Sequence, residues 1–184
     1  MWGKGVAMEL NICSSSKRLE EVKALYMKAF PPEERKPFSI IEDKVREGSM
    51  EILYMEEEGR FLGLAIMILH GDIALIDYLA VSPESRGGGV GTRTLALLKE
   101  RYPERTLLLE IEDPDEPCDN AAERRRRRDF YARNGMIAMD YRIWLFGVKM
   151  LVLTDGAEVP FSRYHAIFPE VFGKKAAENV SLAE

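Results

Sequence analysis

A glycine-rich turn in the middle of the chain is the clearest candidate for binding chemistry. Residues 86–91 read RGGGVG; they follow the apolar run 73–81 and precede the helix-like run 90–101. Glycine lets a backbone adopt positive φ and approach a ligand closely. Unpaired N–H groups and the dipole at a helix start both favour an anion. The sequence therefore predicts a phosphate site formed by Arg86, Gly87, Gly88, Gly89, Val90, Gly91 and Thr92.

The spacing of the glycines separates the known kinds of phosphate loop. A P-loop needs Lys directly after its last glycine, whereas Thr92 and Arg93 follow Gly91 here. A dinucleotide-binding loop needs G-x-G-x-x-G, but the third glycine position falls on Thr92 or Thr94. A plain strand-to-helix turn without a ligand is the remaining structural alternative.

The pattern Arg86-x-x-Gly89-x-Gly91 resembles the Arg/Gln-x-x-Gly-x-Gly/Ala motif of the GNAT superfamily of N-acetyltransferases. In that family the turn holds the pyrophosphate of acetyl-CoA, so the resemblance implies acetyl-CoA as co-substrate. It also implies that a β-bulge in the preceding strand frees backbone N–H groups for the pantetheine arm. The matching residues are Leu79, Ala80 and Val81, whose side chains also fit a buried core.

Hydrophobic periodicity and turn residues predict an α/β chain in the element order of that family, over about residues 8–154. Strands are expected at 8–12, 50–57, 60–69, 73–81, 106–112, 136–144 and 148–154. Helices are expected at 19–30, 39–47, 90–101, 119–133 and 161–172, with capping boxes at Ser39 and Asn120. We expect one domain over 1–184, with a mixed, mostly antiparallel sheet flanked by helices and a C-terminal extension at 155–184.

Tyr131 is the predicted general acid. It lies four residues before Gly135, which is expected to stop its helix. GNAT proteins often carry Tyr at this place, near the sulfur of CoA, and a phenol of pKa ~10 can protonate a departing thiolate. Packing of an aromatic side chain at a helix end is the alternative role.

Three carboxylates are candidates for the general base. Glu110 is the first, and Glu112 and Asp77 follow it. Glu110 and Glu112 share one face of the strand at 106–112, since side chains alternate along a strand. A carboxylate there could take the proton of an amine, directly or through water. The same acids could instead bind a cationic amine or lie in solvent.

Five consecutive arginines at 124–128 form the strongest charge signal. On a helix, consecutive residues point all round the axis, so the run predicts a solvated helix with charge pairs to Glu123 and Asp129. One or two of the arginines could instead meet CoA phosphates or a nucleic acid. The family usually has Asn where this chain has Arg124, which leaves pantetheine contacts from this helix in doubt.

Two further segments bear on the acceptor. Residues 30–38 join the first two helices, where this family often borders the acceptor, and their acids and aromatics could attract and enclose an amine. A proline-stiffened surface loop is the alternative. The tail at 161–172 is expected to pack on its own domain, with closure of the site or formation of a homodimer as alternatives.

Composition excludes several other classes of protein. A net charge of -5 argues against bulk binding of nucleic acid or acidic membranes. Cys13 and Cys118 form no C-x-x-C pair, and two histidines offer no zinc-type cluster, so no metal is expected. The apolar stretch 61–69 is far shorter than the ~20 residues of a membrane span. These features predict a cytoplasmic protein.

Together these features predict an N-acetyltransferase that moves an acetyl group from acetyl-CoA to a primary amine by direct attack. The acceptor is a small molecule or a peptide. A non-catalytic acyl-CoA sensor on the same fold is the alternative, because the base is not fixed by the sequence.

Overall fold

The computed structural model describes residues 7–183. They group into two compact units. Unit 1 holds the described residues up to Leu69 together with Ile76–Pro103, and unit 2 holds His70–Leu75 together with the residues from Glu104 onward. The assignment of one domain to 1–184 stays a prediction, and its residues 1–6 and 184 lie outside the described part.

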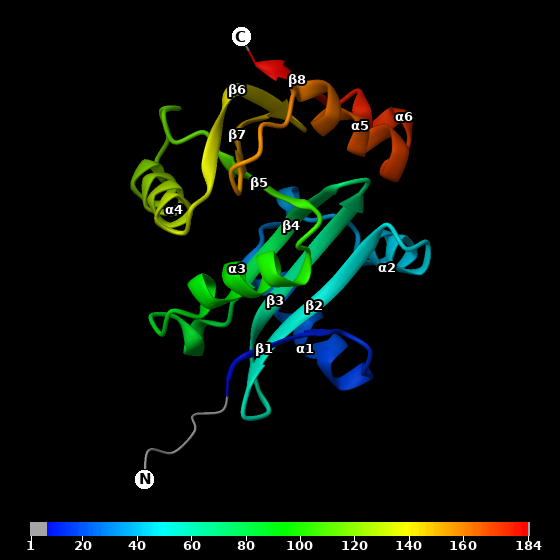
Figure 1. The fold of residues 1–184 in the computed structure, drawn as a ribbon, viewed down its shortest axis with the longest axis vertical. Helices are drawn as coiled ribbons and strands as arrows, with labels where there is room; N and C mark the ends of the chain where they lie inside the picture. The colour runs from blue at the N-terminus through cyan, green and yellow to red at the C-terminus, as the bar shows by residue number, and fades with distance from the viewer. Residues whose placement is uncertain (1–6, 184) are drawn as a thin grey trace. The chain divides into compact units, whose positions relative to one another are not determined.

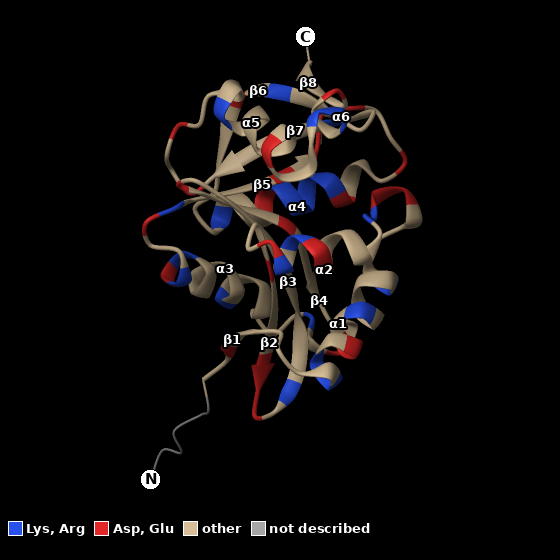
Figure 2. Ribbon diagram, turned by 90° about the vertical axis from the view of Figure 1, so that its right-hand side faces the viewer, with Lys and Arg blue, Asp and Glu red and all other residues tan. Residues whose placement is uncertain are grey.

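Unit 1 is a sheet with helices on both faces. Its strands are β1 (Glu9–Ile12), β2 (Met50–Glu57), β3 (Arg60–His70) and the greater part of β4 (Ile73–Val81), side by side in that order. β1 pairs antiparallel with β2, and β2 pairs antiparallel with β3. Helix α3 (Val90–Arg101) lies on one face, and α1 (Ser16–Ala29) and α2 (Phe38–Arg46) lie on the other (Figures 1 and 2).

The core of unit 1 follows from its central strand. All residues from Leu62 to Ile68 are buried, as expected for a strand covered by helices on both faces. On the α3 side, Val90 packs with Met8, Met55 and Leu62. This cluster anchors the start of α3, which is the helix that follows the glycine turn.

Both expected capping boxes are wrong. Helix α2 begins at Phe38 with Pro37 at its N-cap, and no side chain caps it. Proline is tolerated at a helix start because it lacks the N–H that would be unpaired there, so Ser39 is already inside the helix. In α4 (Ala121–Arg133), Asn120 is the N-cap residue, but its backbone is not extended and its side chain makes no cap hydrogen bond.

In unit 2 the strands follow the order β4-β5-β7-β6-β8, beginning with the first residues of β4. The strands are β5 (Thr106–Glu112), β6 (Ile137–Leu145), β7 (Val148–Thr154) and β8 (Val180–Ala183), and β7 pairs antiparallel with both β5 and β6. Helix α4 lies on one face and α5 (Phe161–Phe172) on the other, followed by the short α6 (Lys174–Ala177) (Figures 1 and 2).

Within unit 2, the C-terminal extension packs through one apolar stripe of α5. Tyr164, Ile167, Phe168 and Val171 are buried, and their spacing of three and four residues places them on one helix face. An ion pair between Arg163 and Asp72 and a hydrogen bond of 2.7 Å between His70 and Glu170 add polar contacts. The expected helix 161–172 is therefore confirmed, while β8, four residues long at the sheet edge, carries no periodicity that would have predicted it.

β3 and β4 approach each other closely at Gly63. A β-carbon at Gly63 would collide with the carbonyl oxygen of Ala80 and lie 3.1 Å from Cα of Val81. Only the absence of a side chain allows this contact, and it lies at two of the three residues predicted to bind pantetheine.

We therefore expect Gly63→Ala to lower the free energy of unfolding by about 1–3 kcal/mol, because the backbone of β4 must shift. Gly88→Ala is the matched control, since its nearest new neighbour, the carbonyl oxygen of Ser85, is 3.8 Å away. Urea unfolding of both variants measures the difference. Equal stability of the two variants would show that β4 relaxes without cost.

Candidate active site

The glycine turn has the backbone geometry of an anion site. Gly87 and Gly89 have φ of 82° and 70°, in the left-handed region that disfavours other residues. Gly89 is the N-cap of α3, no side chain caps it, and the N–H of Arg93 makes the first helical bond, to Gly89 O at 3.0 Å. The N–H groups of Val90, Gly91 and Thr92 come before that bond, and helix geometry provides them no partner.

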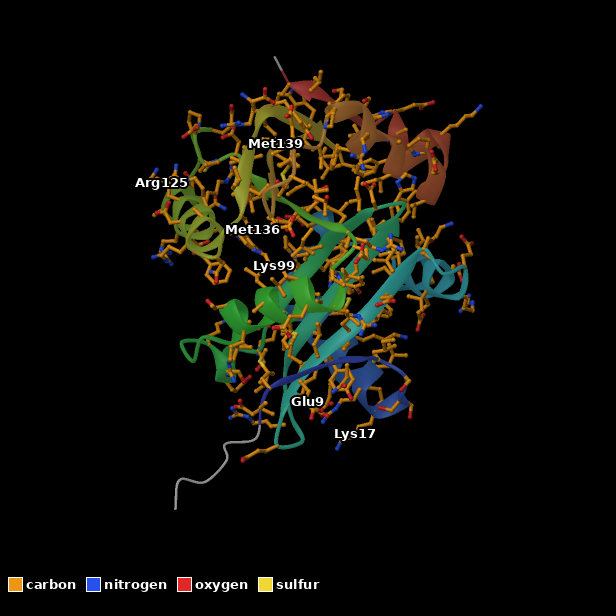
Figure 3. The ribbon with its side chains drawn as sticks, in the orientation of Figure 1. Glu9, Lys17, Lys99, Arg125, Met136 and Met139 are labelled. Atoms are coloured by element: carbon orange, nitrogen blue, oxygen red, sulfur yellow. The ribbon has the colours of Figure 1, made fainter. Side chains whose placement is uncertain are left out.

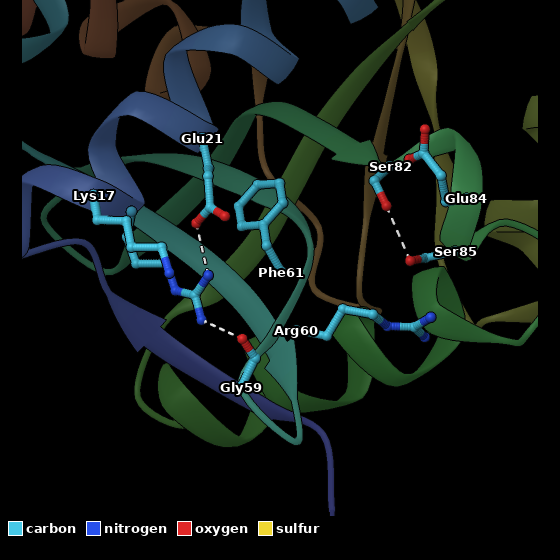
Figure 4. Close-up of a pocket in the computed structure, with 9 residues that line it drawn as sticks. Lys17, Glu21, Gly59, Arg60, Phe61, Ser82, Glu84 and Ser85 are labelled. Carbon is cyan, nitrogen blue, oxygen red and sulfur yellow. Dashed lines mark hydrogen bonds and ion pairs between the residues drawn. The ribbon is translucent and has the colours of Figure 1, made fainter.

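The turn is fixed at its start by the segment that follows β4. The N–H of Ser82 donates to Leu62 O of β3 at 2.8 Å, and Ser82 Oγ donates to Ser85 Oγ at 2.9 Å. Both serines are buried: Ser82 precedes a short 3-10 turn, η2 (Pro83–Ser85), and Ser85 ends it (Figure 4). With Val90 buried at the other end, the glycines lie between two anchored points.

A hollow of about 380 Å³ lies beside this 3-10 turn (Figure 4). Its lining comes from the start of α1, the β2–β3 turn and the segment after β4: Lys17, Arg18, Glu21, Gly59, Arg60, Phe61, Ser82, Glu84 and Ser85. Arg18 is held there by Glu21 at 2.6 Å, by Glu56 at 2.5 Å and by Gly59 O at 2.7 Å. Sequence reasoning missed this hollow because three distant segments form it.

Leu79, Ala80 and Val81 lie on β4 directly before that segment. Ala80 is buried, and Leu79 and Val81 pack against the cluster around Val90, as expected for core side chains. The side chain of Arg86 turns back toward the strand, where its Nε donates to Val81 O at 3.4 Å. The residues predicted to bind the cofactor are therefore brought together within unit 1, and their role in binding stays a prediction.

Asp77, one of the candidate bases, is held in an ion pair. Lys36 Nζ lies 2.7 Å from Asp77 Oδ1 and 2.9 Å from Oδ2, and 5.2 Å from the ring centroid of Tyr78. The N–H of Lys36 donates to the Tyr78 hydroxyl at 3.0 Å, and that hydroxyl donates to Glu34 O at 2.9 Å. The segment 30–38 is thus fastened to β4.

Aromatic rings fill the space beneath this segment. Tyr26 packs against Tyr78, with ring centroids 4.8 Å apart, and also against Phe30 and Phe38. Burial, with the negative charge of Asp77 as a second cause, raises the pKa of Tyr78 to about 12. The expected role of this segment beside an acceptor stays a prediction.

Glu110 lies in unit 2 and has a phenol as its neighbour. Tyr164 of α5, which is fully buried, donates its hydroxyl to Glu110 Oε1 at 2.6 Å. Tyr141 is also near: burial, then the charges of Asp140 and Glu110, raise the pKa of Tyr141 to about 12. No sequence spacing links Tyr164 to Glu110, because the two are 54 residues apart.

Glu112 is engaged by α4. Arg124 Nη2 lies 2.7 Å from Glu112 Oε1, and Arg127 Nη1 lies 3.4 Å from Oε2. Arg124 also donates to Asp113 O at 3.2 Å. Two guanidinium groups of α4 thus converge on the Glu112 carboxylate.

The rest of the arginine run stays at the surface of α4 (Figure 2). Arg126 pairs with Glu123 at 3.9 Å and Arg128 with Asp129 at 2.9 Å, as the sequence predicted. Arg125 is exposed (Figure 3). The run therefore divides into two arginines that hold β5 and three that face away from it.

Tyr131 lies near the end of α4 and is partly buried, with its ring centroid 5.1 Å from that of Phe130. Burial raises the pKa of the Tyr131 phenol, and the charge of Arg127 opposes the shift. The phenol therefore keeps its proton at neutral pH, as a general acid must. Tyr131 and Glu110 both belong to unit 2, and their catalytic roles stay predictions.

Residues 7–183 contain no group of three or more His, Cys, Asp or Glu side chains placed to hold a metal ion. No helix in that same range is long and apolar enough to span a membrane.

The family model described as "Acetyltransferase (GNAT) family" matches residues 19–136, more than half of the 184 residues. The chain belongs to this family. A curated relative, "Putative acetyltransferase YjbC" of Bacillus subtilis (strain 168), is 35% identical over 104 residues, which are 56% of this chain and 50% of that protein. The chain thus spans about half the length of this relative.

Solved structures share the fold. A GNAT-family protein of Bacteroides thetaiotaomicron has a TM-score of 0.75 at 22% identity, covering 91% of this chain and 99% of its own. The ribosomal-protein-S18-alanine N-acetyltransferase of Escherichia coli has a TM-score of 0.60 at 17% identity, covering 80% and 92%. Spermidine N-acetyltransferase of Vibrio cholerae, solved with CoA and spermine, has 0.57 at 13%, covering 80% and 95%. The predicted fold class, an α/β chain with a mostly antiparallel sheet, is confirmed.

If Arg124 is a structural residue, Arg124→Ala should lower the free energy of unfolding by about 1.5–3 kcal/mol, since Glu112 loses its shortest charged hydrogen bond. Arg125→Ala is the matched control from the same run, and an exposed site should change stability by less than about 0.5 kcal/mol. Urea unfolding of the two variants measures the difference. Equal losses of stability would contradict the division of the arginine run into residues that hold β5 and residues that face away from it.

Tyr78 should make stability depend on pH in the alkaline range. Its pKa of about 12 in the folded chain exceeds the ordinary ~10 of an unfolded tyrosine. Between these values the unfolded chain releases a proton that the native chain keeps, so unfolding becomes easier as pH rises. The free energy of unfolding, measured in urea from pH 9 to 11.5, should fall more steeply with pH for wild type than for Tyr78→Phe. The two slopes should differ by at most about 1.4 kcal/mol per pH unit. Parallel curves would contradict the assignment.

Proposed function

We propose that the chain transfers an acetyl group from acetyl-CoA to a primary amine by direct attack, without an acyl-enzyme. The observation that carries the proposal is the uncapped start of α3, where left-handed Gly89 leaves the N–H groups of Val90, Gly91 and Thr92 before the first helical bond. Membership of the GNAT family supports acetyl-CoA as the anion that this turn binds.

The cofactor contacts proposed here are all in unit 1. The turn 86–92 holds the pyrophosphate through backbone N–H groups and the positive end of α3. The backbone of Leu79, Ala80 and Val81 binds the pantetheine arm. When bound, acetyl-CoA supplies a thioester whose carbonyl carbon accepts the amine and whose thiolate leaves.

The partners of the three candidate carboxylates favour Glu110 as the base. Glu112 is paired with Arg124 and Arg127, and Asp77 is paired with Lys36. Glu110 accepts a hydrogen bond from the neutral phenol of Tyr164 instead. Glu110, the first candidate from the sequence, is the proposed base that takes the proton of the attacking amine.

Tyr131 is the proposed acid that protonates the thiolate. The acceptor is a small molecule or a peptide with a primary amine. Solved structures of the same fold include enzymes named for spermidine and for the alanine of a ribosomal protein, which supports both classes without choosing between them. A cytoplasmic location and a homodimer stay predictions.

Tyr131→Phe should lower kcat by roughly ten- to a thousand-fold, because the thiolate must leave without a proton donor. The measurement is thiol release from acetyl-CoA over a panel of spermidine, free lysine and a peptide with N-terminal alanine. Tyr141→Phe is the control, since this tyrosine of unit 2 also has a raised pKa but donates to the backbone oxygen of Val159.

Thermal shift on the same proteins separates binding from turnover. Acetyl-CoA and CoA, but not NAD, should stabilise wild type and Tyr131→Phe alike, by about 2.7 kcal/mol at a hundred times the Kd. Stabilisation without thiol release for any amine would indicate an acyl-CoA sensor. No stabilisation would show that the glycine turn is only a structural turn.

A further inference from the structure

We propose that Lys36 is itself an acceptor, so that the chain acetylates its own Lys36 side chain from acetyl-CoA. The inference rests on the proposed function, since it uses the same bound thioester. It names a modification site and a chemical class of acceptor, a lysine ε-amine held on a carboxylate. All residues that carry it belong to unit 1.

The Lys36 amine is held in one place, unlike an ordinary surface lysine. Both carboxylate oxygens of Asp77 contact Nζ, at 2.7 and 2.9 Å, and the Tyr78 ring lies beneath it. The backbone is fixed as well, because Lys36 O accepts from the Tyr26 hydroxyl at 3.0 Å and Lys36 N donates to Tyr78. The side chain nevertheless remains 27% exposed, so a ligand can reach it.

The amine is held beside the strand segment proposed to bind pantetheine. Asp77 precedes Leu79 by two residues on β4, so both lie on the same face, about 7 Å apart along the strand. Val81, two residues further along β4, lies on this same face as well. A thioester carried by a pantetheine arm bound along this segment therefore lies within reach of the four-carbon Lys36 side chain. Fixing an amine near a carbonyl raises its rate of attack.

The step balances with the groups present. The Lys36 ammonium gives one proton to Asp77, the carboxylate that already contacts Nζ, and Asp77 passes it to water. The neutral nitrogen then attacks the thioester carbonyl carbon; a C–N bond forms and the C–S bond breaks. The nitrogen gives its second proton to the departing thiolate, so CoA leaves as its thiol. The product is an uncharged amide, so the ion pair with Asp77 is lost.

Lys23 provides a matched comparison within unit 1. It is also paired with a carboxylate, Glu42 at 2.6 Å, and also lies over a ring, that of Phe38 at 4.9 Å. Its side chain is 41% exposed, more than that of Lys36. Uncatalysed acetylation by acetyl-CoA should therefore favour Lys23, whereas self-acetylation in the site should favour Lys36.

The test incubates the full chain with acetyl-CoA and no added amine, then measures acetylation at each lysine by peptide mass spectrometry. We expect the initial rate at Lys36 to exceed that at Lys23 by about tenfold or more. The rate per molecule should not depend on protein concentration, and excess CoA should suppress acetylation at Lys36 more than at Lys23. Acetylation of Lys36 no faster than Lys23 overturns the proposal.

Two further readouts keep the outcome clear. Lys36→Arg, which retains a cation for Asp77, should remove most of the acetyl incorporated, whereas Lys23→Arg should not; the wild-type site ratio decides if either variant fails to fold. Thermal shift and thiol release with added amines run beside it. If both respond to acetyl-CoA and Lys36 is not preferred, only self-acetylation fails; if neither responds, the proposed function fails with it.

Discussion

The start of α3 is the constraint on which the proposed site depends. A helix must find partners for its first N–H groups, and proteins usually provide a Ser, Thr, Asp or Asn side chain for this purpose. Here the N-cap is Gly89 in the left-handed region, which provides no side chain. The buried Val90 on one side and the Ser82–Ser85 contact on the other hold this uncapped turn in place. Rigid anchors around an unsatisfied helix start favour an external anion as the missing partner.

Charge partners, more than position along the strands, distinguish the three carboxylates. Glu110 and Glu112 are neighbours on one face of β5, and sequence alone gives them equivalent surroundings. Two arginines of α4 form ion pairs with Glu112, and a tyrosine of α5 donates a hydrogen bond to Glu110. A neutral hydroxyl donor and a pair of guanidinium groups thus give the two carboxylates different electrostatic surroundings. The C-terminal extension thus bears on the proposed chemistry through the Tyr164 hydroxyl.

Local patterns in the sequence predicted the elements well, because periodicity, glycines and prolines act over a few residues. The strands β2, β3 and β4, the helix after the glycine turn and the helix 161–172 all follow from such patterns. The expected capping box at Ser39 was wrong because the spacing Ser39–Glu42 does not account for Pro37, whose fixed φ starts the helix one residue earlier. Contacts such as Lys36 with Asp77, 41 residues apart, depend on how elements pack and leave no mark in spacing.

The arginine helix shows how electrostatics can do what packing usually does. An ordinary surface helix is held by an apolar stripe, but none of the residues of α4 is classed as buried. Arg124 and Arg127, one turn apart, contact β5 by converging on Glu112. Such pairs are only partly shielded from solvent, so salt weakens them more than it weakens a buried core. The placement of Tyr131 on the same helix is therefore coupled to charge, and the side chain proposed as acid depends on arginines that composition alone would assign to solvent.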